Sequence, residues 1–332
     1  MSENTNDLLE LLDIKKSALL VIDLQNGFCH KDGNLGQSGV DTDRLSSVIP
    51  PLKNVIERCN AVGMPVLWTV QEHFEKDERR ARKRLPSHTS KRKNITALAG
   101  TWDADIVEDL KYLITNPSYV IRKHRFGAFY ETRLNVLLEM LGVESLFITG
   151  LTTNACVDTT FREAYLRDFD VVAIEDCISG VNPEWEEPAK KVWRHYLGIT
   201  VDSGNFLHWV ERQQEPRTLG LAHLAIQVSD FDKSSFFYLD LLGFQARTDA
   251  VPLADGRPLI STRQGLGITT GGPGDGKQVD HIAFEVSNVK ALADKLKAHD
   301  VTFVKDVAPG AYGLTIYVKD PDGNTIELFE KI

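Results

Sequence analysis

Short apolar segments alternate with amphipathic segments along the first two thirds of the chain. Apolar runs predict buried strands at residues 18–22, 64–70, 145–149 and 170–174. Apolar residues at helical spacing predict helices at residues 41–62, 131–141 and 188–196. Such alternation is typical of a parallel sheet with helices on both faces. We therefore predict an α/β fold with a doubly wound, mainly parallel sheet up to about residue 210.

A different pattern follows residues 211–217, which are polar and contain Pro216. It consists of a strand and then a helix, and it occurs twice. The first copy has the strand at 219–228 and the helix at 231–242, and the second copy has them at 279–286 and 289–299. Both strands carry a His-x-Ala motif, which begins at His223 in the first and at His281 in the second. An internal repeat of this kind indicates a domain built from two similar units.

Length and charge narrow the class of protein. A chain of 332 residues is long for one domain, and we predict a first domain at 1–213, a linker at 214–218 and a second domain at 219–332. The net charge of −9 argues against nucleic acid and anionic membranes as partners. No apolar run is long enough to cross a membrane, and the four cysteines show no disulfide spacing. We therefore predict a cytoplasmic protein.

A strongly basic segment at residues 76–93 interrupts the first domain. It has two interpretations, a solvated excursion or a lid that attracts an anionic substrate. No aromatic residues alternate with its charges, which argues against binding of nucleic acid.

Three chemically suited side chains follow predicted strands. Asp23 comes after residues 18–22, Lys123 after a short β-branched run, and Cys156 where a helix begins after residues 145–149. Parallel strands bring their carboxyl ends to one edge of a sheet, so we expect a base, a cation and a thiol to meet there. The helix start also predicts a lowered pKa for the Cys156 thiol.

At these residues the chain resembles the isochorismatase-like cysteine hydrolases, over roughly residues 10–212. The resemblance is closest to the amide- and ureide-cleaving branch, which includes biuret hydrolase and ureidoacrylate amidohydrolase. It rests on Asp23-Leu-Gln-Asn-Gly-Phe-Cys29, on Gly100-Thr-Trp-Asp103 and on Thr152-Thr-Asn-Ala-Cys156. The metal motif of the nicotinamidase branch is absent at residues 68–73, so no cofactor is expected for this domain.

The resemblance implies a mechanism. Asp23 acts as general base, Lys123 stabilises the thiolate, and Cys156 forms an acyl enzyme. It also implies a cis peptide bond at Leu151–Thr152, which directs the backbone N–H groups of Thr152 and Cys156 at the oxyanion.

We expect the substrate to contact Phe28, Phe129 and His73. The chain departs from the family at Phe126-Gly127, where a serine often precedes Ala-Phe, so a polar substrate contact is missing.

The second domain resembles the vicinal-oxygen-chelate superfamily of glyoxalases and extradiol dioxygenases. That resemblance implies two βαβββ units curled into a cup, with His223, His281 and Glu327 as ligands of Fe, Mn or Zn. A fourth ligand of the glyoxalase type would lie near residues 268–270, where no acid stands. The alternative is that the two histidines are packed or hydrogen-bonded without a metal.

These expectations give a function with alternatives. The principal prediction is a cysteine amidohydrolase that cleaves a C–N bond of a small amide or ureide. Both resembled families also suggest a homo-oligomer. One alternative is an isochorismatase-type enol-ether hydrolase. Others are a ligand-binding protein and a metal-dependent oxygenase or lyase centred on the second domain.

Overall fold

The chain divides into two compact units, Met1–Gln213 and Gln214–Ile332. The computed structural model describes residues 5–74, 95–216, 218–253, 255–271, 279–321 and 323–331. The basic segment at residues 76–93 lies outside the described residues, so its two interpretations stay predictions. No helix within the described part of the chain is both long enough and apolar enough to span a membrane.

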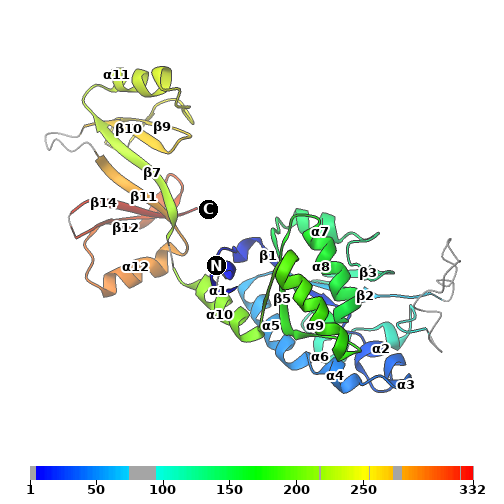
Figure 1. Ribbon diagram of the computed structural model, residues 1–332. Coiled ribbons are helices and arrows are strands. Elements are labelled where there is room, and N and C mark those ends of the chain that lie inside the picture. The colour runs from blue at the N-terminus through cyan, green and yellow to red at the C-terminus, as the bar shows by residue number, and fades with distance from the viewer. Residues whose placement is uncertain are drawn as a thin grey trace. The chain divides into compact units, whose positions relative to one another are not determined.

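The first unit is built on a six-stranded sheet in the order β3-β2-β1-β4-β5-β6 (Figure 1). All of its neighbouring strands are parallel. The strands are β1 (Ser17–Ile22), β2 (Val66–Gln71), β3 (Val120–Lys123), β4 (Ser145–Leu151), β5 (Asp170–Ser179) and β6 (Ile199–Val201). The predicted doubly wound parallel sheet is confirmed.

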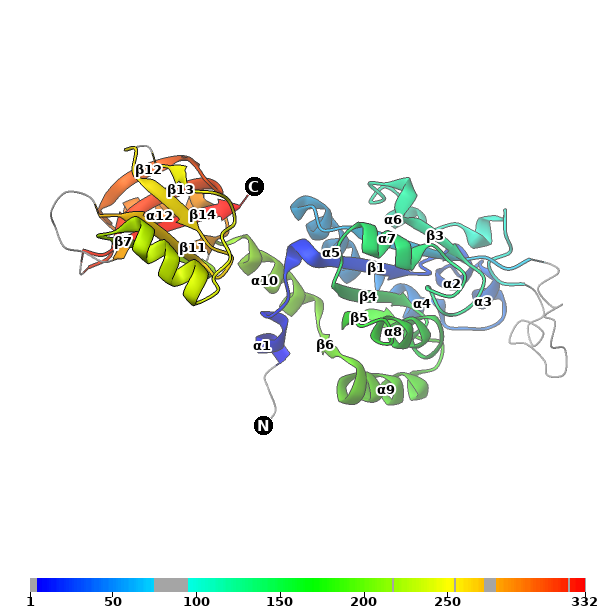
Figure 2. The same cartoon turned by 90° about the horizontal axis from the view of Figure 1, so that it is seen from above.

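Helices cover both faces of this sheet (Figure 2). Side chains of β1 alternate between the faces: Leu19 and Val21 pack in one core, and Leu20 and Ile22 pack in the other. The first core includes α5 (Ile49–Val62) and α10 (Ser203–Gln214), and the second includes α7 (Leu134–Met140) and α8 (Asp158–Tyr165). The shorter helices are α1 (Thr5–Leu9), α2 (Asn26–Cys29), α3 (Asn34–Gln37), α4 (Thr42–Ser46) and α6 (Glu108–Lys111).

The helix expected at 131–141 is α7, which begins three residues later, and two other predicted helices of the first unit differ more in their bounds. The helix expected at 41–62 is divided into α4 and α5, because Pro50 and Pro51 lack the N–H of a helix interior and occupy the first turn of α5. The helix expected at 188–196 is α9 (Pro183–Val192), which continues as a π-helix at Trp193–Leu197. Its earlier start is explained by Asn182, whose side chain accepts a hydrogen bond from the Glu184 N–H.

The second unit is an eight-stranded sheet in the order β12-β13-β14-β11-β7-β10-β9-β8. Each half contains one strand, one helix and three strands in chain order, as the βαβββ resemblance implied. The first half contains β7 (Thr218–Val228), α11 (Phe231–Ser235), β8 (Val251–Pro252), β9 (Pro258–Ser261) and β10 (Leu266–Thr270). The second contains β11 (Val279–Val286), α12 (Val289–Ala298), β12 (Phe303–Gly310), β13 (Gly313–Lys319) and β14 (Thr325–Lys331).

The two halves are related by their pairing. The first strands of the halves, β7 and β11, pair antiparallel at the centre of the sheet. The last strand of each half pairs parallel with the first strand of the same half, β10 with β7 and β14 with β11. Between the units, α10 runs to Gln214 and β7 starts at Thr218. The polar residues 211–214, read from the sequence as part of the boundary, therefore belong to a helix.

Candidate active site

The carboxyl ends of three strands in the first unit carry Asp23, Lys123 and Cys156. Asp23 follows β1, Lys123 ends β3, and Cys156 lies five residues beyond β4. Lys123 Nζ lies 2.7 Å from Asp23 Oδ2, and neither side chain is more than 1% exposed. Asp23 and Cys156 line the same cavity. The structure thus brings together the three residues that the sequence singled out.

Lys123 is held by several acceptors. Its Nζ donates to Gln71 Oε1 at 2.8 Å and to the Arg125 carbonyl at 3.1 Å, in addition to its ion pair with Asp23. Three acceptors match the three N–H groups of an ammonium, which makes the buried charge tolerable.

The two oxygens of Asp23 differ. Oδ1 accepts a hydrogen bond from the Thr69 hydroxyl at 2.7 Å. Oδ2 pairs with the Lys123 ammonium at 2.7 Å. A carboxylate oxygen has two lone pairs, so Oδ2 keeps one for a proton beside this ion pair.

The charges of this group depend on burial. Burial raises the pKa of Cys156 to about 12, although attraction to Lys123 opposes the rise. Burial lowers the pKa of Lys123, but Asp23 and Cys156 outweigh it, so the pKa is raised overall. The prediction of a lowered Cys156 pKa is wrong. The thiolate loses more stabilisation by leaving water than it gains from the helix start and from Lys123. The resting group is a thiol beside a carboxylate–ammonium pair.

The chain around Cys156 has unusual local structure. The peptide bond Leu151–Thr152 is cis, as the resemblance implied. A π-helix at Thr153–Val157 follows and runs into α8, so the helical segment starts before residue 155. The Thr152 carbonyl accepts hydrogen bonds from the N–H groups of Ala155 and Val157.

Gly150 allows β4 to approach β1. Its φ is +105°, and a Cβ there would collide with the carbonyl oxygen of Ile22, the residue before Asp23. Only glycine satisfies both conditions. The close approach of the two strands sets the distance between the residues that follow them.

The cavity beside Cys156 measures about 90 Å³. Of the predicted substrate residues, Thr152, Phe28 and His73 line it. Phe129 is not among its lining residues: its ring packs against Phe169 and lies under the Arg167 guanidinium. Phe126 lines the cavity instead.

His73 has a defined hydrogen-bond pattern. Its Nδ1 lies 2.6 Å from the Thr96 carbonyl, which can only accept, so we assign the proton to Nδ1. Its Nε2 lies 3.3 Å from Gln71 Nε2 and accepts from that amide. Gln71 therefore connects Lys123 to His73. Gln71 and Thr69 were not predicted as site residues. Their spacing of two residues in a buried strand is nevertheless a signal, because it puts both side chains on the same face of the sheet.

The second unit gathers His223, His281 and Glu327 from three neighbouring strands. One ligand atom of each lies within 4.8 Å of the others. The two Nε2 atoms are 3.1 Å apart, and Glu327 Oε2 lies 3.4 Å from His223 Nε2 and 3.1 Å from His281 Nε2. These are atoms that carry lone pairs, so the group has the donor set of a divalent metal site.

Neighbouring side chains orient this group. Asp280 Oδ2 lies 2.8 Å from His281 Nδ1, and the Thr315 hydroxyl donates to Glu327 Oε1 at 3.0 Å. Burial lowers the pKa of His281, but hydrogen bonds to Asp280 and Glu327 outweigh it and raise it to about 9. Burial raises the pKa of Glu327, yet both histidines hold it well below its usual range. Carboxylate support of a histidine is the usual second layer of a metal site.

Comparisons with known proteins identify the family of this chain. The family model of the isochorismatase domain matches residues 17–204, which include all three residues of the buried group. The chain belongs to the isochorismatase family. Its first unit is a hydrolase of this family. The model of the glyoxalase, bleomycin resistance protein and dioxygenase superfamily matches residues 220–328, which include His223, His281 and Glu327.

Individual relatives cover the first unit. The ureidoacrylate amidohydrolase RutB of Enterobacter sp. (strain 638) is 29% identical over 188 residues, which are 52% of this chain and 79% of that protein. An isochorismatase family protein from Desulfovibrio vulgaris is 26% identical with a TM-score of 0.51, over 59% of this chain and 99% of its own. A cysteine hydrolase from Pseudomonas syringae pv. phaseolicola shares the fold at 17% identity and a TM-score of 0.52, over 61% of this chain and 95% of its own.

Proposed function

We propose that the first unit of this isochorismatase-family protein hydrolyses a C–N bond of a small amide or ureide through Cys156. The observation that carries the proposal is the buried Asp23–Lys123 pair, 2.7 Å apart, which shares a cavity with the thiol. The similarity to a ureidoacrylate amidohydrolase supports the choice of an amide bond.

The raised pKa of Cys156 sets the order of proton transfers. A thiol with a pKa of about 12 is not ionised near neutral pH, so its proton must leave as sulfur attacks. Asp23 Oδ2 takes that proton while Cys156 Sγ bonds to the carbonyl carbon. Asp23 then gives the proton to the departing nitrogen as the C–N bond breaks, which leaves a thioester.

Water completes the cycle. Asp23 takes a proton from a water molecule that attacks the thioester, the C–S bond breaks, and the sulfur leaves as the thiol on receiving that proton. Lys123 stays protonated throughout and stabilises the negative charge on the sulfur. We assign stabilisation of the oxyanion to the backbone N–H groups of Thr152 and Cys156, since Thr152 lines the cavity next to the nucleophile.

The size and lining of the cavity restrict the substrate. A volume of about 90 Å³ has room for only several water molecules, because one water needs roughly 10–15 Å³. Phe28 and Phe126 supply flat apolar walls, and Gln71 and His73 supply the polar contacts. This combination suits a small planar group such as a ureide. Lys123 supplies the cation, so we propose no metal or cofactor for this reaction.

Release of ammonia tests the proposal. The full chain is incubated with biuret, ureidoacrylate, N-carbamoyl amino acids, nicotinamide and maleamate, beside the variants Cys156→Ala and Cys59→Ala. Cys59 is another buried cysteine, on α5 and outside the cavity. We expect release from at least one ureide or amide, unchanged in Cys59→Ala and lost in Cys156→Ala.

Two results would contradict this function. Release that persists in Cys156→Ala would exclude the thiol mechanism. Silence across the panel would favour the enol-ether alternative, which does not need the cysteine.

For the second unit we propose a divalent metal bound by His223, His281 and Glu327. The convergence of three ligand atoms within 4.8 Å supports it, as does the Asp280 contact to the far nitrogen of His281. Such a metal would supply a Lewis acid with open coordination positions. Packing of the histidines without a metal is the alternative, and the two are separated by a metal titration described below.

A further inference from the structure

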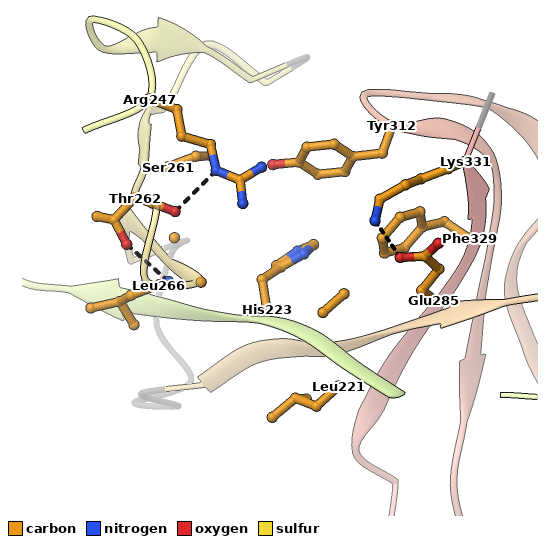
Figure 3. A pocket seen from close by; sticks show the side chains of 13 residues that line it. Leu221, His223, Arg247, Ser261, Thr262, Leu266, Glu285, Tyr312, Phe329 and Lys331 are labelled. Carbon is orange, nitrogen blue, oxygen red and sulfur yellow. Dashed lines mark hydrogen bonds and ion pairs between the residues drawn. The ribbon is translucent and has the colours of Figure 1, made fainter. Parts of the chain in front are cut away.

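A second cavity lies in the second unit, beside His223 (Figure 3). It measures about 240 Å³, against about 90 Å³ beside Cys156. Its walls come from both halves of the sheet: Arg247 and Thr262 from the first half face Tyr312 and Phe329 from the second. It therefore has room for a larger ligand than the hydrolase cavity.

The register of the sheet explains why this space is open. In β14, Glu327 is paired with Ala283, two residues after His281. In β10, the residue paired with Ala225, two residues after His223, is Gly267. Gly267 is thus the counterpart of Glu327 in the other half, and it lines the cavity.

The missing side chain at this position leaves usable space. The atoms nearest to a Cβ on Gly267 would belong to Leu259 and Ala225, at 3.5 Å and 3.7 Å, which are ordinary contacts. The fourth-ligand position therefore falls on residue 267, just before the range 268–270 that the sequence suggested. An outside molecule can approach His223 where the other half has a carboxylate.

Among the described residues that line this cavity, Arg247 is the one cation without a carboxylate partner. Arg247 is fixed at its base, since its Nε donates to the Thr262 carbonyl at 3.2 Å and its backbone N–H donates to the Ser261 carbonyl at 2.8 Å. Its terminal amino groups have no hydrogen-bond partner among the described residues, and Figure 3 shows the guanidinium pointing toward Tyr312. Lys331 does not add to this charge, because it is paired with Glu285.

The opposite wall is aromatic. The ring centroids of Tyr312 and Phe329 are 5.4 Å apart, and that of His223 lies 5.6 Å from Tyr312 and 6.2 Å from Phe329. Three rings at these spacings present flat surface to a ligand. A guanidinium with free amino groups presents a fork that fits a carboxylate.

We propose that this cavity binds a small planar carboxylate. Its carboxylate pairs with Arg247, its flat body lies against Tyr312 and Phe329, and its far end points toward His223. A carboxylate suits the site better than a phosphate dianion, because the described part of the cavity wall contains one unpaired cation and also the carboxylate of Glu285.

The proposed ligand is a carboxylate, and hydrolysis of an amide by the first unit yields a carboxylate. This link rests on the proposed function of the first unit. Binding in the second unit does not, and it is tested in the Cys156→Ala background, where an amide probe is not converted to a carboxylate.

Calorimetric titration of the chelator-treated full chain carrying Cys156→Ala, with benzoate and with benzamide, tests the site. The two probes share a ring and differ in charge. We expect benzoate to bind at least about 10-fold more tightly than benzamide. Arg247→Gln should weaken benzoate by about 10- to 100-fold and leave benzamide unchanged.

Arg263→Gln is the matched control, since the Arg263 N–H donates to the carbonyl of Gln245, two residues before Arg247, but Arg263 does not line the cavity. It should leave both probes unaffected. Equal affinity for the two probes, no binding of benzoate, or an Arg247→Gln variant that binds benzoate normally would each overturn the proposal.

Gly267→Glu is an independent variant that fills the space from the other side. We expect it to abolish benzoate binding while circular dichroism and the melting temperature show that the chain is folded. Unchanged benzoate binding in folded Gly267→Glu protein would place the ligand elsewhere and overturn the proposal.

Discussion

Each unit buries one carboxylate at its candidate site, and the two carboxylates have different partners. Asp23 is 1% exposed and lies 2.7 Å from the ammonium of Lys123. Glu327 is 5% exposed and lies 3.1 Å and 3.4 Å from the Nε2 atoms of two histidines. The first has a permanent cation from the chain itself, whereas the second faces two imidazoles, which become metal ligands when they lose a proton.

This difference separates two kinds of site. A carboxylate that is already neutralised by a lysine has no need of a metal and can accept and return a proton. A carboxylate grouped with two imidazole nitrogens is a ligand set, which is completed by a cation from solution. Substitutions, a metal titration and thiol alkylation each test this contrast.

The largest effect is expected from breaking the Asp23–Lys123 pair. Asp23→Asn or Lys123→Met should lower kcat/KM by about 100-fold or more. Either change also leaves one buried group unpaired, so Lys123→Met should lower the free energy of unfolding of the first unit by about 3–5 kcal/mol. Asparagine is chosen because it tolerates the φ of +53° at residue 23.

The double variant Asp23→Asn/Lys123→Met sharpens this test. It removes both charges, so urea unfolding should recover most of the lost stability while activity stays lost. Recovery of activity in the double variant would contradict the proton-transfer role of Asp23. Lys16→Met, at an exposed ion pair with Glu144, is the control and should change neither quantity appreciably.

The second effect concerns metal and should be confined to the second unit. Fe(II), Mn(II) or Zn(II) added to chelator-treated protein at 100 times its dissociation constant should stabilise that unit by about 2.7 kcal/mol, since it binds only the folded state. Thermal melting measures the shift. Glu327→Gln should remove the shift, and hydrolysis by the first unit should be the same with and without metal.

A melting curve that does not change on addition of metal would contradict the expected difference between the two units. The histidines would then be packed groups, as the alternative interpretation states. Loss of hydrolysis on chelation would also contradict this contrast, because the first unit would then depend on a metal.

The third effect is the pH dependence of Cys156 alkylation. Because its pKa is raised to about 12, the thiolate fraction should rise about tenfold per pH unit between pH 7 and pH 10. The rate of modification by iodoacetamide, followed by mass spectrometry of the Cys156 peptide, should rise in the same proportion. A plateau below pH 9 would reveal a thiolate that exists before substrate binds.

The smallest effect is expected at Thr69, which donates to Asp23 at 2.7 Å. Thr69→Val should cost about 1 kcal/mol of stability and lower kcat several-fold, by roughly the value of one hydrogen bond. Thr149→Val is the matched control, because that buried threonine donates to the Leu20 carbonyl at 3.0 Å on a neighbouring strand. A similar stability loss with normal kcat is expected there, and equal effects on kcat would contradict a special role of Thr69.

Much of the first site could be predicted because it depends on strand order. Asp23, Lys123 and Cys156 each follow an apolar run, and parallel strands bring such positions to one edge. The pKa of Cys156 could not be predicted, because burial is a property of the folded surroundings. Exchange of Phe129 for Phe126 as a lining residue has a similar cause, since the direction of a side chain in a loop is not set by strand or helix period.

The sequence also predicted part of the second site. The repeat located His223 and His281, but the counterpart of Glu327 required the strand register, which identifies Gly267. Arg247 was missed because it lies in the irregular segment just before β8, where no periodicity marks it. A cytoplasmic location and assembly into a homo-oligomer stay predictions.

Gly150 has a consequence for how this chain can vary. Any side chain there would push against the Ile22 carbonyl and separate β4 from β1. A library that randomises codon 150 and is selected for hydrolysis would therefore return glycine almost alone. Among functional descendants the position would look as invariant as the nucleophile, although it takes no part in bond making and is fixed only by the distance between two strands.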